Sequence, residues 1–471
     1  MEKVEKFWMA EYILLLGLLI LGLAGIVYSW LVFLLILLTI LGAVLAWRYM
    51  PRILVILPAL IPFLPALNPQ ADIDLAASRL VIVFLFVIGS IYIVYTKRNW
   101  FYLSTPTVLI LFFLFWSLSS VIMADDKGIF LRKYLVFLTI FPLYFLLLAF
   151  LRRREQWQKL FEYWSWSAFI VSFIGLGQFL FQFIGGQQLF FKFWGNYVAP
   201  VLYGTNAGEA VASNPSWFVN ISGITVLRAI GTFPDPHMLA FFLGMTLPIQ
   251  AALALKRMKY YWILPGLSLL VLLLTFSRGS YVGLAGVILW LAIYFWRNYP
   301  QKRQRILVGA LLIILLSSIL PPVRDRFTSI LDVYEGSNKG RLEIWNEALG
   351  ITLQNPLLGV GLGNYANAVR PESKYREPIY AHNTYLDLAS EIGFPGAIAW
   401  ILLLYWAVKP LLSFKRENIL NLAVALGIGW FALHGFFETP VYSPQILPLI
   451  LVLIAYRGYF NNLSQTRSST R

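Results

Sequence analysis

Long apolar segments separated by short polar ones run along almost the whole chain. A helix that crosses a bilayer needs about 20 mostly apolar residues, because no water is available there to satisfy its backbone groups. The pattern predicts an all-α fold, a polytopic transmembrane bundle of about 14 helices, with 12 as the lower bound. Its helices are 11–30, 31–47, 53–67, 80–96, 104–124, 133–151, 160–184, 237–255, 260–276, 281–296, 306–320, 384–408, 418–437 and 441–456. The third contains Pro58, Pro62 and Pro65 and is expected to be kinked or partly re-entrant.

The composition is far too apolar for a soluble protein, with 59% hydrophobic and 13% charged residues. The absence of cysteine excludes disulfides, thiolate catalysis and cysteine-based metal sites. The net charge of +15 comes from short basic clusters between apolar segments. Such clusters are typical of loops that face anionic lipid, so we expect the lipid bilayer, and not nucleic acid, as the partner.

The charges also predict the sidedness of the chain. With a cytoplasmic N-terminus, 23 of the 37 basic residues but only 6 of the 22 acidic ones fall in inner loops. The positive-inside rule therefore places both termini in the cytoplasm. The first apolar run is too long for the core of a signal peptide and lacks a cleavage site, so we interpret it as a retained helix.

Two predicted outer segments are too long to be turns, and connections of this length usually carry function. They divide the chain into N-terminal helices 1–184, an outer loop 185–236, central helices 237–320, a large outer loop 321–383, and C-terminal helices with a cytoplasmic tail 384–471. We find no internal repeat, so the sequence does not support a repeat-built transporter.

The large outer loop contains a predicted helix and a glycine-rich turn. Capping residues at 337–338 and an Asn-Pro pair at 355–356 bound the helix. Leu342, Trp345 and Leu349 share one face, which predicts a helix lying on the membrane interface. Arg341 would then lie at headgroup depth, either binding phosphate or snorkelling beside an interfacial Trp. The turn at 359–363 lacks the G-x-G-x-x-G spacing of a phosphate-binding loop, so we interpret it as a flexible turn.

His382 ends this loop, just before a helix start for which Thr384 and Asp387 have the spacing of a capping box. Its reference pKa of about 6.5 suits it to take a proton from a hydroxyl. The alternative is a histidine hydrogen-bonded to a loop carbonyl. Of the other two histidines, His237 follows an Asp-Pro pair and is assigned to a helix start. His434 is interpreted as a packed polar group or a supporting partner of the site.

Arginines at the predicted outer surface indicate the substrate. Arg278 interrupts two apolar runs, and Arg228 approaches the membrane from the same side as a weaker candidate. An arginine at the membrane edge is costly, and a phosphate partner would explain it. A guanidinium pairs bidentately with phosphate oxygens, and a lipid diphosphate presents its charge at the depth predicted for Arg278 and Arg341. We therefore predict a lipid-diphosphate sugar donor and an acceptor hydroxyl activated by His382.

These residues resemble the O-antigen ligase and O-antigen polymerase family of bacterial membrane glycosyltransferases. The resemblance covers about residues 228–396 and is carried by Ser277-Arg278-Gly279, Gly340-Arg341 with Trp345, 355–364, His382-Asn383 with Tyr385, and 391–396. It implies a GT-C-like, metal-independent enzyme without a cofactor, in the bacterial inner membrane, with its active site facing the periplasm or cell exterior. By this likeness the catalytic residues are His382, Arg278 and Arg341, and the substrate-binding residues are Arg228, Trp345, Asn383 and Tyr385.

The implied reaction transfers an undecaprenyl-diphosphate-linked oligosaccharide, polymerising O-antigen or exopolysaccharide repeat units or ligating them to an acceptor. The acceptor stays open: a lipid A core sugar, the next lipid-linked repeat unit or a protein hydroxyl. The predicted helix number favours a polymerase. The implied partners are the lipid-linked glycan donor, a glycan or lipid-linked acceptor, a chain-length regulator and a flippase.

Two other functions fit part of the pattern. Asp72, Asp74 and the Asp125-Asp126 pair in outer loops suggest a metal-dependent oligosaccharyltransferase, although the positive-inside rule already explains acidic outer loops. A flippase or exporter of lipid-linked glycans has a similar helix number but is expected to carry charges near the midplane of its spans.

Overall fold

The computed structural model describes residues 30–70, 73–97, 103–205, 215–221, 223–299, 301, 336–369, 380–413 and 418–469. Within these ranges eight helices are long and apolar enough to cross a membrane, and three shorter helices are apolar. Helices dominate and no sheet is closed among these residues. The predicted all-α, polytopic membrane class is therefore confirmed. The predicted helices 11–30 and 306–320 lie outside the described residues, apart from Trp30.

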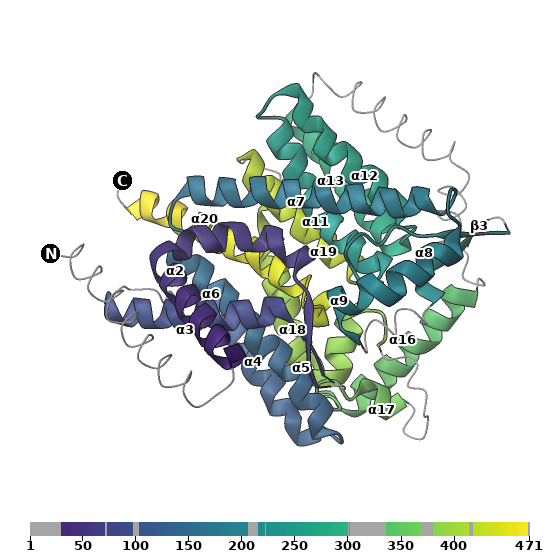
Figure 1. Cartoon of the computed structure of the whole chain (residues 1–471), viewed down its shortest axis with the longest axis horizontal. Helices are drawn as coiled ribbons and strands as arrows, with labels where there is room; N and C mark the ends of the chain where they lie inside the picture. The colour runs from purple at the N-terminus through teal and green to yellow at the C-terminus, as the bar shows by residue number, and fades with distance from the viewer. Residues whose placement is uncertain are drawn as a thin grey trace.

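The elements follow one another as a chain of helices with two short hairpins (Figure 1). The helices are α2 Trp30–Leu60, α3 Ala77–Tyr95, α4 Thr105–Ser119, α5 Lys127–Ile140, α6 Pro142–Phe150, α7 Arg154–Phe181, α8 Gln187–Phe193, α9 Ala199–Tyr203, α11 Pro236–Ala254, α12 Ile263–Leu274, α13 Arg278–Asn298, α16 Gly336–Gln354, α17 Tyr365–Val369, α18 Thr384–Ser413, α19 Ile419–His434 and α20 Leu447–Ser469. The antiparallel hairpins pair β1 Ala66–Gln70 with β2 Ile73–Ala76, and β3 Phe218–Ile221 with β4 Ile224–Leu227.

The predicted helices 31–47 and 53–67 are one bent helix, α2. The bend lies at Tyr49, whose φ of −123° and ψ of 18° are not helical. Pro51 follows it in the first turn of the second half, where a missing N–H costs nothing, so the helix resumes. The predicted end at residue 67 is wrong, because α2 ends at Leu60 and the chain continues into β1. The sequence did not predict this hairpin, since Pro69 interrupts its first strand.

The centre of the bundle is the antiparallel pair of α11 and α19, which pack against each other along their length. Glycines allow this approach. A Cβ on Gly244 would lie 1.9 Å from Trp430 Nε1, and a Cβ on Gly427 would lie 2.5 Å from the backbone oxygen of Met245. The pair brings the N-terminus of α11 to the C-terminus of α19.

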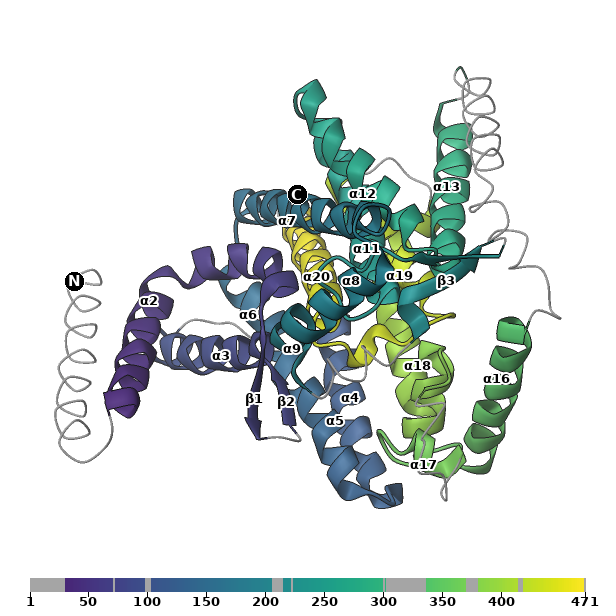
Figure 2. The ribbon, with the colours of Figure 1, turned by 45° about the vertical axis from the view of Figure 1, so that its right-hand side comes forward.

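The helix predicted in the large outer loop is present as α16. Figure 2 shows α16 standing beside α18, with α17 near their common end. Trp345 points back into the protein, and its Nε1 donates a hydrogen bond of 3.1 Å to the carbonyl of Ala381. Leu342 and Leu349 on the same helix are exposed. The hydrogen bond of Trp345 therefore ties α16 to the residue that precedes His382.

The glycine-rich turn is also present, and it is packed between two parts of the bundle. Gly359 and Gly361 have φ values of +63° and +90°. A Cβ on Gly359 would lie 2.4 Å from the backbone oxygen of Ser390, and a Cβ on Gly361 would lie 2.6 Å from the Cα of Ala124. The glycines therefore allow close approach of two backbones, which explains the motif without a bound phosphate.

Replacing Gly361 by Ala should destabilise the protein. The left-handed backbone costs an L residue about 1–2 kcal/mol, and an overpacked contact costs about 1–3 kcal/mol more. We expect a lower unfolding temperature for Gly361→Ala in detergent. The matched control is Gly350→Ala in α16, where a Cβ meets nothing within 4 Å; it should be neutral or slightly stabilising. Equal unfolding temperatures for the two variants would contradict this explanation of the motif.

Candidate active site

The candidate site lies where four helix ends meet: the N-termini of α11, α13 and α18 and the C-terminus of α19. Asp235 caps α11, accepting hydrogen bonds of 2.7 Å from the amide of His237 and 2.9 Å from that of Met238. This confirms the predicted Asp-Pro helix start. Each helix N-terminus carries a partial positive charge, so three of them favour an anion at their meeting point.

The start of α18 differs by one residue from the predicted capping box. The side-chain oxygen of Asn383 accepts hydrogen bonds from the amides of Tyr385 and Leu386, so Asn383 and not Thr384 is the N-cap. The Tyr385 hydroxyl donates to the carbonyl of Ala432 at 2.6 Å. Asn383 and Tyr385, predicted to bind substrate, thus both have structural contacts here. The predicted capping box of Thr384 and Asp387 is wrong because both side chains make contacts with other parts of the chain instead.

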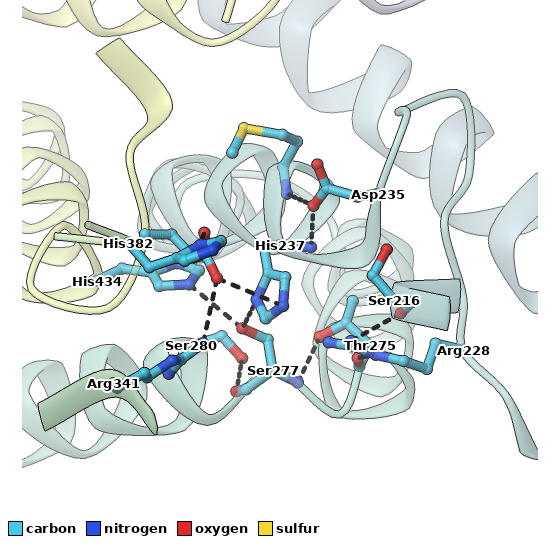
Figure 3. A network of polar contacts seen from close by, with 12 residues as sticks. Ser216, Arg228, Asp235, His237, Thr275, Ser277, Ser280, Arg341, His382 and His434 are labelled. Carbon is cyan, nitrogen blue, oxygen red and sulfur yellow. Dashed lines mark hydrogen bonds and ion pairs between the residues drawn. The ribbon is translucent and has the colours of Figure 1, made fainter. Parts of the chain in front are cut away.

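Arg341, His237 and His382 lie close together in a polar network (Figure 3). The centre of this network is Glu438, which the sequence analysis missed. Its Oε1 lies 3.2 Å from Nη2 of Arg341 and 3.6 Å from Nε2 of His237, and its Oε2 lies 3.0 Å from Nδ1 of His382. The residue is buried, with 7% of its surface exposed. The available signal was an acid four residues after His434 at a predicted outer helix end. Arg341 and His382, both predicted to be catalytic, are therefore brought together by this carboxylate.

The charges in this network support one another. Burial alone would raise the pKa of Glu438, but His237, His382 and Arg341 outweigh it and hold that pKa well below its ordinary value. The charge of Glu438 in turn raises the pKa of His382, against the opposing effects of burial and Arg341. His382 also has a φ of +50°, an uncommon backbone conformation that persists only where the surroundings impose it.

Ser277 links the start of α13 to two histidines. Its Oγ lies 2.9 Å from Nδ1 of His237 and 3.3 Å from Nε2 of His434. The His434 ring is fully buried and stacks on Phe241 at 3.8 Å between ring centroids. A Cβ on Gly279 would lie 2.4 Å from Cδ2 of His434, so a glycine is needed there for α13 to reach the end of α19. His237, assigned only to a helix start, thus also contributes its side chain to the network.

The three predicted arginines differ in their placement. Arg341 belongs to the network directly. Arg278 is the first residue of α13, next in the chain to a network residue, and is buried. Arg228 lies to one side (Figure 3), where Nε donates to the carbonyl of Thr275 at 2.7 Å and Nη1 to that of Ser216 at 2.9 Å. These two hydrogen bonds hold the β3–β4 hairpin region against the end of α12.

Asp387 holds together the two chain segments that carry His382 and Glu438. Its Oδ1 accepts a hydrogen bond of 2.7 Å from the amide of Ala381, and its Oδ2 accepts one from the hydroxyl of Thr439. Ala381 directly precedes His382, and Thr439 directly follows Glu438. One buried carboxylate therefore fixes the spacing between the imidazole and its carboxylate partner.

Further polar residues on α18 continue this attachment. Thr384 donates through Oγ1 to the carbonyl of Glu438 at 2.7 Å. Two turns later, Glu391 accepts a hydrogen bond of 2.6 Å from the hydroxyl of Tyr442 and forms an ion pair of 3.3 Å with Lys133. The Lys133 ammonium also lies 3.7 Å from the centroid of the Tyr442 ring. The segment after α19 is thus held along one side of α18.

The carboxylates that suggested a metal site are only partly described. Asp126 caps α5, its Oδ1 accepting a hydrogen bond of 2.9 Å from the amide of Ile129. Asp72 lies outside the described residues. Across the described part of the chain, no group of three or more His, Asp or Glu residues is arranged to hold a metal ion.

Residues 264–401 match the family described as O-antigen ligase. This segment is an O-antigen ligase family domain. The match confirms the family resemblance inferred from the sequence and implies a glycosyltransferase-like membrane enzyme of glycan assembly. The O-antigen ligase domain includes Arg278, Arg341 and His382, whereas His237 and Glu438 lie outside the matched residues. No curated protein matches the chain.

Asp387→Ala should displace His382, and the predicted role of His382 as a base makes slower glycan transfer the expected result. We expect kcat to fall about 10- to 100-fold with a smaller change in KM, because a displacement of about 1 Å can cost that much. Asp387→Asn should restore most activity, since its amide can accept from the amide of Ala381 and donate to the hydroxyl of Thr439. Transfer rates and unfolding temperatures of both variants are the measurements. Full activity of the Ala variant, or an Asn variant as slow as the Ala variant, would contradict a positioning role.

Proposed function

We propose that this protein transfers a glycan from undecaprenyl diphosphate to a hydroxyl acceptor at the outer face of the inner membrane, polymerising O-antigen or exopolysaccharide repeat units or ligating them to an acceptor. The observation that carries this proposal is the shared carboxylate of Glu438, which holds Arg341 and His382 side by side. The guanidinium of Arg341 suits a diphosphate, and the imidazole of His382 suits the proton of a hydroxyl group.

Arg341 supplies the cation for the donor. Its side chain is 20% exposed, and a guanidinium has five N–H donors, so its bond to Glu438 leaves donors for phosphate oxygens. Arg278 at the start of α13 supplies a second cation from the neighbouring helix end. The three helix N-termini add positive potential at the same place, which stabilises the charge that develops on the leaving diphosphate.

His382 supplies the base. With Nδ1 donating to Glu438, Nε2 is the nitrogen that takes a proton, and the side chain is 41% exposed. The acceptor oxygen attacks the anomeric carbon while its proton passes to Nε2. The bond from that carbon to the diphosphate oxygen breaks, and undecaprenyl diphosphate leaves with the electron pair. A single displacement of this kind inverts the anomeric configuration.

The acceptor separates the members of this reaction class. Because two predicted helices are the single helix α2, the helix number no longer favours a polymerase. The purified full chain in liposomes should convert defined undecaprenyl-diphosphate-linked repeat units into a product ladder if it is a polymerase. A product formed only when a lipid A core or a protein acceptor is added would identify a ligase or a protein glycosyltransferase.

The same liposomes test the other two functions. Activity that persists in a divalent-metal chelator is expected, and loss restored by added metal would favour the metal-dependent reaction. His382→Ala should abolish transfer while leaving the donor bound. If this variant instead left polymer length and amount unchanged while cells accumulated lipid-linked subunits inside, the flippase alternative would replace our proposal.

The pH dependence of transfer should report the pair of His382 and Glu438. A base must be deprotonated, so kcat/KM should rise with pH through the pKa of His382, which the carboxylate raises above its ordinary value. Glu438→Gln removes that charge, so the rising limb should move to lower pH while the maximal rate falls. A pH–rate profile of both proteins measures this, with the unfolding temperature as a control. If the rising limb of the pH–rate profile lay at the same pH in both proteins, His382 would not be the titrating base.

A further inference from the structure

A cavity of about 620 Å³ lies between α2 and α7, remote from the candidate active site. The two helices run side by side (Figure 1), and Ser167 Oγ of α7 donates to the carbonyl of Ala59 in α2 at 2.7 Å. The cavity is at the N-terminal end of α7, whereas Gln182, just after its C-terminal end, bonds to Leu227 near the outer site. About 20 residues of helix separate these ends, or about 30 Å, which matches the apolar thickness of a bilayer.

Three cations line this α2–α7 cavity: Arg52 from the bend of α2, and Arg153 and Lys159 from the start of α7. All three are exposed, and none forms an ion pair with a carboxylate among the residues that the structure describes. Glu155 is the single acid in the lining. The cavity therefore has a net positive charge that the described protein does not neutralise.

Apolar side chains continue the cavity along both helices. On α2, Val55 and Ile56 follow Arg52 by one turn, and on α7, Tyr163 follows Lys159 by one turn. Because Ala59 of α2 meets α7 further along, the two helices enter the membrane in the same direction. Both walls thus change from cationic to apolar at the same depth. A phospholipid has the matching order of groups, with a phosphate followed by acyl chains.

We propose that the α2–α7 cavity binds an anionic phospholipid, with its phosphate between Arg52, Arg153 and Lys159 and an acyl chain along Val55, Ile56 and Tyr163. Basic pockets between spanning helices at the cytoplasmic surface suit anionic lipid headgroups, and a guanidinium binds phosphate bidentately. A phenol ring at the boundary of the apolar wall is typical of headgroup depth. A zwitterionic headgroup would leave the net positive charge of the cavity unbalanced.

The α2–α7 cavity begins just after the bend of α2. The helix changes direction at Tyr49, and Pro51 stands at the cavity wall where the second half begins. A lipid in the space fills it and adds binding energy to the folded state, because the unfolded chain has no such site.

The test is lipid retention by the purified full chain, measured by native mass spectrometry after titration with phosphatidylglycerol or phosphatidylcholine. The parent protein should bind phosphatidylglycerol selectively. Arg52→Gln and Arg153→Gln should each weaken that binding about five-fold, with little effect on phosphatidylcholine. The matched control is Arg48→Gln, an exposed arginine one turn earlier on α2 that does not line the cavity.

Arg52→Lys keeps the charge and should retain the selectivity for phosphatidylglycerol. This result would show that the site survives substitution. Equal binding of the two lipids, or equal losses in Arg48→Gln and the cavity variants, would overturn the proposal. Inorganic phosphate and glycerol phosphate distinguish a free anion from a lipid. If millimolar inorganic phosphate displaced phosphatidylglycerol completely, the cavity would be a soluble-phosphate site and the lipid assignment would be wrong.

Discussion

The end of this bundle where α11, α13, α18 and α19 meet depends on one buried carboxylate that a guanidinium and two imidazoles share. Removing one partner from a buried ion pair costs about 3–5 kcal/mol, because a charge is left without compensation. Arg341, His382 and His237 come from α16, the segment before α18 and the start of α11. Glu438 therefore connects elements that are otherwise far apart in the chain, and the ion pair with Arg341 is one of the contacts that fix α16 to the bundle.

The same charges serve the fold and the proposed chemistry. Three helix N-termini and Arg341 stabilise the ionised carboxylate, and this positive potential is also what an incoming diphosphate requires. In the proposed reaction, the diphosphate uses the N–H donors of Arg341 that Glu438 leaves open. The close approach that aligns these helix ends depends on small residues, among them Gly244, Gly279 and Gly427.

Sequence reasoning found the parts of this site that lie in one segment and missed those that come from elsewhere. Arg341 and His382 stand out within the large outer loop, whereas Glu438 lies 97 and 56 residues from them and reads locally as an ordinary loop acid. His237 was explained completely by its Asp-Pro helix start, so its side chain needed no further role. The long apolar helices were predictable because length and composition determine them, but the predicted break between residues 47 and 53 is a bend within one helix.

The α2–α7 cavity and the candidate active site lie at opposite ends of α7, and both would attract phosphate. They differ in the groups that surround the anion, and this difference would confine the reaction to the candidate active site. The α2–α7 cavity offers cations and apolar walls, so a phosphate bound there has no base beside it. At the other end, Gln178 and Gln182 attach α7 to the backbone of Gly231 and Leu227, next to the helix end that carries His237. Only there does an imidazole accompany the cations, because a buried carboxylate holds His382 in place. In our proposals, positive charge binds a lipid phosphate at both sites, and the base that is present at one of them turns binding into transfer.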